Sequence, residues 1–170
     1  VSEGWKVADQ IAAAGVACSM INIDSPGGKL EARDLNPAAG AILEKAGVLT
    51  GFHSDDGITD SRLFRRMAAM SVRYGMSRKA ALAGLTSAGA KMLHLDDRVG
   101  TLEKGKHADF LILSGDPFSI YTHVEQTWIE GNQVFDLSNP DDALYASGGY
   151  GASHDQTWDH IHDIAGEEGH

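Results

Sequence analysis

The sequence predicts an α/β fold, because helix-like and strand-like segments alternate along its first ninety-odd residues. Apolar side chains recur at helical spacing in some of these segments, and short apolar runs bounded by glycine or polar residues separate them. The run 48–52 is the clearest of these, and it suits a strand that is buried on both faces. Alternating helices and strands imply right-handed crossovers and parallel strands.

The predicted elements of the first part of the chain follow one another through short connections. Two strands are expected, at 16–23 and 48–52. Four helices are expected, at 5–14, 37–46, 60–74 and 78–93. Asn36 and Ser77 are the expected N-caps of the second and fourth helices, because their side chains accept hydrogen bonds from the first turn. Two strands are too few to close a barrel or to form a covered sheet alone.

The pattern changes after Leu95. A turn-rich connection at 99–106 leads to a predicted strand at 108–113. Two further strands, 122–129 and 133–135, flank Glu130-Gly131-Asn132, which predicts a tight hairpin because glycine and asparagine accept positive φ. The residues from Ser138 onward are rich in glycine and look irregular, with at most a short helix near 158–164. We therefore divide the chain into segments 1–95, 96–137 and 138–170.

Composition excludes several classes of function. The chain has 170 residues, of which 42% are hydrophobic, and this is enough for one domain with a core. A formal net charge of −10 argues against nucleic acid or an anionic membrane as the main partner. Cys18 is the only cysteine, so no intrachain disulfide is possible and a buried, inert thiol is expected. No apolar run approaches the length of a membrane span. The sequence predicts a soluble chain. It does not identify the cellular compartment, although the cytoplasm is favoured.

The candidate functional residues follow the second predicted strand. His53, Asp55 and Asp56 come directly after the run 48–52. In α/β proteins the carboxyl ends of the strands hold the chemistry. An imidazole and two carboxylates at such an end are compatible with several kinds of site. The histidines and aspartates of the tail, at 154–170, include a His-x-His pair, but this spacing alone is weak evidence for a built metal site.

The glycine and proline spacing of the second half resembles a known family. The segments that carry the resemblance are 81–93, 98–113, Gly115-Asp116-Pro117 and 131–134, together with Val124. They are similar to the C-terminal part of metal-dependent amidohydrolases, with the imidazolonepropionase-like branch as the nearest. The resemblance covers roughly residues 1 to 136.

The resemblance implies the fold in more detail. Members of the family combine a (β/α)8 TIM-like barrel with a small β-sandwich. Segment 16–23 would be the seventh barrel strand and 48–52 the eighth, so residues 1–95 would form the C-terminal part of the barrel. Segment 108–135 would then supply the C-terminal part of the sandwich.

The resemblance also implies a role for one carboxylate. In this family an aspartate after the eighth strand ligates a divalent metal, with zinc favoured, and moves a proton from the metal-bound water to the leaving amine. The family pattern of a small hydroxyl residue followed by aspartate falls on Ser54-Asp55, so Asp55 is both the catalytic and the metal-binding candidate. The resemblance assigns no role to the two neighbouring candidates. His53 is either a partner that orients Asp55 or a packed histidine, and Asp56 either binds substrate or caps the following helix.

Two functions from different classes follow. The first is a C-terminal part of a hydrolase that cleaves carbon–nitrogen bonds in a small amide or cyclic amide. The other metal ligands of the family would lie upstream of Val1, so the isolated chain is expected to be inactive and to need a missing N-terminal barrel portion or copies of itself. The second is a non-catalytic oligomeric or complementing module that lacks a metal site. Open strand edges make a lone monomer unfavourable in both cases.

Overall fold

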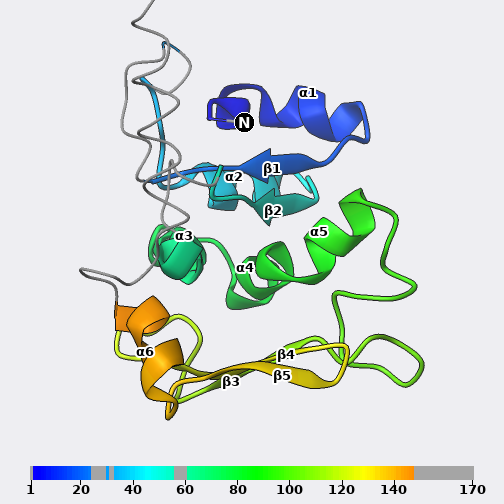
Figure 1. Ribbon diagram of the computed structural model, residues 1–170. Coiled ribbons are helices and arrows are strands. Elements are labelled where there is room, and N and C mark those ends of the chain that lie inside the picture. The colour runs from blue at the N-terminus through cyan, green and yellow to red at the C-terminus, as the bar shows by residue number, and fades with distance from the viewer. Residues whose placement is uncertain (1, 24–29, 31–32, 56–60, 148–170) are drawn as a thin grey trace, which may run out of the picture.

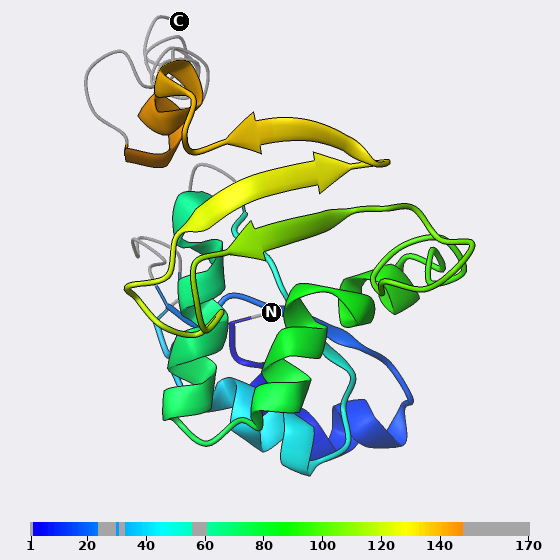
Figure 2. The same ribbon diagram turned by 90° about the horizontal axis from the view of Figure 1, so that it is seen from below.

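The computed structural model describes residues 2–23, 30, 33–55 and 61–147 (Figure 1). Within these ranges, five strands form a parallel pair, β1–β2, and an antiparallel sheet of order β3-β4-β5. Figure 1 shows helices α3, α4 and α5 between the two. The view from below shows α1 and α2 on the far side of these helices from the antiparallel sheet (Figure 2). In the described ranges no helix is long and apolar enough to cross a bilayer.

The elements alternate as predicted in the first part of the chain. The strands are β1 Cys18–Met20, β2 Thr50–Phe52, β3 Phe110–Leu113, β4 Val124–Ile129 and β5 Asn132–Asp136. The helices are η1 Gly4–Val7, α1 Ala8–Ala13, α2 Ala39–Lys45, η4 Ser61–Leu63, α3 Phe64–Arg73, α4 Arg78–Leu85, α5 Ser87–Met92 and α6 Pro140–Ser147. The first two strands are shorter than predicted, and the parallel pairing that was expected of them is confirmed.

Strand β1 packs one face on the core and exposes the other, whereas all three residues of β2 are buried. Cys18 and Met20 are 3% and 1% exposed, whereas Ser19 between them is exposed. Period-2 alternation therefore places the apolar side chains of β1 against the helices and the serine on the opposite side. The core cluster contains residues from both strands and from α1 to α4, among them Leu43, Phe52, Met67 and Ala81. Burial raises the pKa of the Cys18 thiol, as expected for an inert cysteine.

The N-cap predicted for the fourth helix, Ser77, is confirmed. The predicted helix range, 78–93, is wrong, because two shorter helices occupy it. The Ser77 side chain accepts a hydrogen bond from the Ala80 amide at 3.1 Å. The helix then ends at Leu85, and α5 begins at Ser87. Thr86 separates them with φ −137° and ψ −93°, and its hydroxyl donates to the Leu82 carbonyl at 2.9 Å. A threonine hydroxyl that bonds to the backbone competes with helical hydrogen bonding, and sequence periodicity cannot detect this break.

The predicted hairpin is present, with a shift of one residue in its turn. Positive φ falls on Glu130 (51°) and Gly131 (78°), while Asn132 is already the first residue of β5. Two positive φ values in a two-residue loop match the twist of the flanking strands. The Asp109 side chain accepts a hydrogen bond from the Glu130 amide at 2.7 Å, which stabilises the turn.

A helix occupies part of the segment that was expected to be irregular. Helix α6 begins at Pro140, where the missing N–H group removes no helical hydrogen bond. The Asn139 side chain accepts from the Asp141 amide at 3.0 Å, and Asp141 and Asp142 lie in the first turn, where carboxylates interact favourably with the helix dipole. The high glycine content further along the chain obscured these start signals. The short helix expected near 158–164 lies outside the described residues.

One turn attaches the antiparallel sheet to the helices. Arg65 of α3 donates to the carbonyls of Pro117 (3.0 Å) and Thr122 (2.7 Å). Arg78 of α4 forms a two-oxygen ion pair with Asp116 at 2.8 Å. The Phe118 amide and Arg78 together hold the pKa of Asp116 below its ordinary value. The attachment therefore depends on two arginines from adjacent helices.

We expect Arg65→Ala to lower the free energy of unfolding by about 1–3 kcal/mol, because two carbonyls lose a charged donor. Urea denaturation measures the change. Arg73→Ala on the same helix is the matched control, because Arg73 is exposed at the helix end. Equal effects of the two substitutions would contradict the attachment role of Arg65.

Candidate functional site

The candidate residues lie where β2 ends beside β1. The His53 amide donates to the Met20 carbonyl at 3.1 Å, which continues the parallel ladder past the last residue of β2. Ser54 and Asp55 follow at the same end, the carboxyl end of both strands. The structure thus places His53 and Asp55 at the edge that the sequence predicted, whereas Asp56 lies outside the described residues.

A hydroxyl from the neighbouring strand contacts the histidine ring. Ser19 Oγ lies 2.9 Å from His53 Nδ1. Ser19 pairs in register with Gly51, so His53 is two residues further along on the same face. Sequence analysis did not identify Ser19. Its place between two apolar residues predicts that it faces away from them, but only the strand register shows which residue it meets.

Burial lowers the pKa of His53 below the ordinary value of 6.5, and the charge of Asp55 opposes this shift without cancelling it. The ring is half-buried, so its charged form loses hydration. The shift favours the neutral imidazole, in which one nitrogen donates and the other accepts.

Asp55 combines a left-handed backbone conformation with an exposed side chain. Its φ is 58°, in the left-handed region that aspartate adopts more readily than most residues. Its side chain is exposed. The chain turns immediately after β2, and the carboxylate is held at the strand end in contact with solvent.

The described residues do not make up a complete metal site. Across the described ranges, no three His, Cys, Asp or Glu side chains are grouped so that they could hold an ion. A catalytic zinc site takes three protein ligands and leaves one position open. Asp55 can supply one oxygen ligand, and the candidate residues of the tail lie beyond the described ranges. A bound metal would need further ligands.

Asn22, just beyond β1, is a second polar residue that sequence analysis did not single out. It is 1% exposed, and its amide donates to Ser71 Oγ at 2.7 Å and to the Met67 carbonyl at 3.4 Å. These contacts join the carboxyl end of β1 to α3, the helix that follows the candidate site. Both hydrogen bonds hold α3 against the strand pair.

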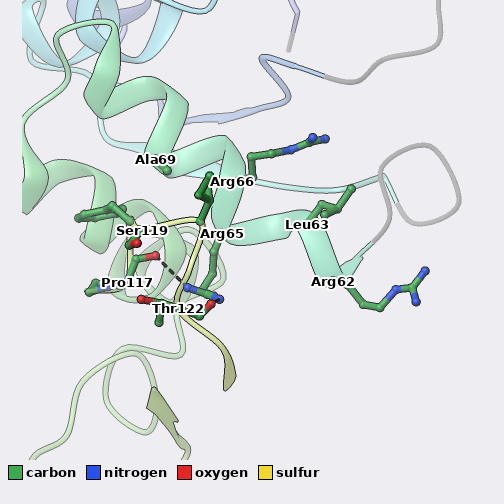
Figure 3. Close-up of a pocket in the computed structure, with 10 residues that line it drawn as sticks. Arg62, Leu63, Arg65, Arg66, Ala69, Pro117, Ser119 and Thr122 are labelled. Atoms are coloured by element: carbon green, nitrogen blue, oxygen red, sulfur yellow. Dashed lines mark hydrogen bonds between the residues drawn. The ribbon is translucent and has the colours of Figure 1, made fainter. Parts of the chain in front are cut away.

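A separate cavity of about 140 Å³ lies between the start of α3 and the turn that carries Pro117 and Thr122 (Figure 3). Arg65 points into this turn, whereas Arg62 and Arg66 point away from it in different directions. The guanidinium groups therefore do not converge on one point. The cavity is part of the attachment of the antiparallel sheet, and none of its lining residues belongs to the strand ends.

Known proteins match this chain in sequence and in structure. Residues 5–135 match the amidohydrolase family. The amidohydrolase tasK of Hapsidospora irregularis is 33% identical over 116 residues, which are 66% of this chain and 12% of that protein. The crystal structure of an amidohydrolase from Thermotoga maritima is also 33% identical and superposes with a TM-score of 0.75, covering 79% of this chain and 35% of that one.

A more distant structure shares the fold. An adenosine deaminase from Xanthomonas campestris with bound zinc is 22% identical, with a TM-score of 0.55 over 75% of this chain and 34% of that one. This chain thus spans about a third of the solved structures that it matches and an eighth of the curated relative. The family match covers most of its length, from η1 to β5. The chain belongs to the amidohydrolase family.

Proposed function

We propose that this chain is the C-terminal part of a hydrolase that cleaves carbon–nitrogen bonds, with Asp55 as its catalytic carboxylate. The observation that carries the proposal is the position of Asp55: exposed, at the carboxyl end of β2 and beside the parallel strand β1, in a chain of the amidohydrolase family. Strand ends of this kind hold the reacting groups in α/β barrels.

In this proposal the parallel pair is the last two strands of a (β/α)8 barrel. Residues 1–95 form the C-terminal part of the barrel, residues 96–137 contribute to a small β-sandwich, and residues 138–170 form a separate C-terminal segment. The parallel pairing supports the first assignment, and the three-stranded antiparallel sheet supports the second. The imidazolonepropionase-like branch is the proposed place of the chain within its family.

A divalent metal, with zinc favoured, is part of the proposed reaction. Such a metal polarises the bond under attack and makes water a better nucleophile at neutral pH. Asp55 is the described residue that would contact it. Since three protein ligands are needed, polypeptide outside the described residues must supply the others.

Asp55 itself would move a proton. Its carboxylate accepts a proton from the attacking water and donates it to the leaving nitrogen, as a general base and then a general acid. His53 contributes a neutral imidazole to the same strand end. Asp56 is a further proposed contact for the substrate.

The proposed substrate is a small amide or cyclic amide. The proposed partner is the remaining part of a barrel, supplied by an N-terminal portion or by further copies of the chain. The second candidate function is a non-catalytic oligomeric or complementing module that lacks a metal site. The observation behind it is that the described residues do not include three side chains grouped to hold a metal.

Complementation tests the proposal. We expect the chain alone to bind less than stoichiometric zinc and to hydrolyse no amide. We expect zinc binding and amide hydrolysis when it is mixed with the part of the Thermotoga maritima amidohydrolase outside the match. Zinc content and hydrolysis of a panel of N-acyl and cyclic amides are the measurements.

The control replaces this chain with the matching segment of the Thermotoga maritima protein itself. If that pair is active and the pair with this chain neither binds zinc nor hydrolyses any amide, the hydrolase proposal is wrong and the module is favoured. Stoichiometric zinc bound by the chain alone through Asp55 would overturn the view that the site is incomplete.

A further inference from the structure

The contact between Ser19 and His53 joins the two strands on the face of the parallel pair opposite Cys18 and Met20. Ser19 is exposed while its neighbours Cys18 and Met20 are buried. Its hydroxyl nevertheless lies within hydrogen-bond distance of the ring nitrogen, 2.9 Å away.

The strand register makes this contact possible. Ser19 pairs with Gly51, which carries no side chain, so no side chain of β2 stands between the hydroxyl and the ring two residues on. A Cβ at Gly51 would lie 3.2 Å from Met92 Cε, so this position is already packed from α5.

The contact fixes the ring and leaves its second nitrogen available. The His53 amide is bonded to Met20, and Nδ1 is bonded to Ser19. Among the described residues none contacts Nε2 through a hydrogen bond. Because a hydroxyl can donate to or accept from a ring nitrogen, the contact with Ser19 orients the ring.

We propose that Ser19 is a positioning residue, whose hydroxyl holds the His53 ring so that Nε2 meets a polar atom of the amide substrate beside Asp55. This inference rests on the proposed function, since it names a contact of the same site. The substrate amide has both an acceptor oxygen and a nitrogen, so either tautomer of His53 finds a complementary atom. Ser19 acts on the substrate only through the ring.

Nitrogen-15 NMR of the full chain tests how the ring is held. We expect Ser19→Ala to shift the His53 Nδ1 resonance toward that of an unbound ring and Ser19→Thr to retain the wild-type value, because threonine keeps the hydroxyl. The ring signals that are present in the wild type and absent from His53→Gln are assigned to His53. Ser119→Ala, which removes a half-buried hydroxyl 100 residues away in the sequence, should leave them unchanged.

Hydrolysis by the complemented, zinc-loaded protein tests the positioning role. We expect Ser19→Ala to lower kcat/KM about 3- to 10-fold, the effect of losing one neutral hydrogen bond, and Ser19→Thr to restore most of it. In a His53→Ala background, Ser19→Ala should have no further effect, because the two residues act as one unit.

The outcomes separate this inference from the proposed function. Unchanged ring resonances in Ser19→Ala, or independent losses from Ser19→Ala and His53→Ala in an active protein, would overturn the positioning role and leave the hydrolase proposal standing. A complemented wild-type protein without hydrolysis contradicts the proposed function and the substrate contact together. The NMR comparison then still shows whether Ser19 holds the ring.

Discussion

Asp55→Asn is expected to lower kcat for amide hydrolysis by about 10²- to 10⁴-fold in the complemented, zinc-loaded protein, the range for loss of a general acid–base group. An amide side chain has nearly the shape of the carboxylate but cannot accept the proton. Asparagine also tolerates the left-handed backbone at this position, where φ is 58°. The loss should therefore be chemical and not a consequence of misfolding.

Steady-state kinetics and urea denaturation together test this expectation. A residue that acts in the transition state lowers kcat and kcat/KM by similar factors, with little change in KM. Asp96→Asn is the matched control, since Asp96 is also an exposed aspartate outside any helix or strand and is remote in sequence from the strand ends. Asp55→Asn activity within threefold of wild type would remove Asp55 from the catalytic role.

The second large effect concerns stability. Leu43→Ala should lower the free energy of unfolding by about 2–5 kcal/mol, because it removes a buried side chain and leaves a cavity. Leu43 lies on α2 in the core against the strand pair and is 1% exposed. Urea denaturation of the full chain, analysed for midpoint and slope, gives the change.

The control for this substitution is Leu82→Ala on α4. Leu82 is 46% exposed, and both substitutions replace leucine with alanine inside a helix, so their effects on helix propensity are the same. We expect a loss below about 1 kcal/mol at Leu82, since surface substitutions rarely exceed this. Equal losses at the two positions would show that α2 does not pack on the core as described.

Much of the fold follows from local patterns in the sequence. The N-cap at Ser77, the location of the individual strands and the hairpin turn depend on residues close together in the chain, so periodicity and turn chemistry predict them. The break at Thr86 and the helix that begins at Pro140 were not predicted. Both depend on which backbone group a short polar side chain bonds to, and several such choices have similar energies.

The candidate site, like the fold, was only partly predictable from the sequence. The position of His53 and Asp55 at a strand end was predictable, because a buried apolar run followed by polar residues marks such an end. The division of the chain into three segments and the role of Asp55 remain predictions for the experiments above.

Residue type and order along the chain were enough to indicate an α/β amidohydrolase segment, and they predict Asp55 as its catalytic residue. The pairing of Ser19 with His53 and the attachment of the antiparallel sheet through Arg65 emerged only in the folded molecule. Ser19 and His53 are 34 residues apart, and Arg65 and Thr122 are 57 apart. Contacts over such distances depend on strand register and helix packing, which arise from burial of the whole core and leave no mark in any short stretch of sequence.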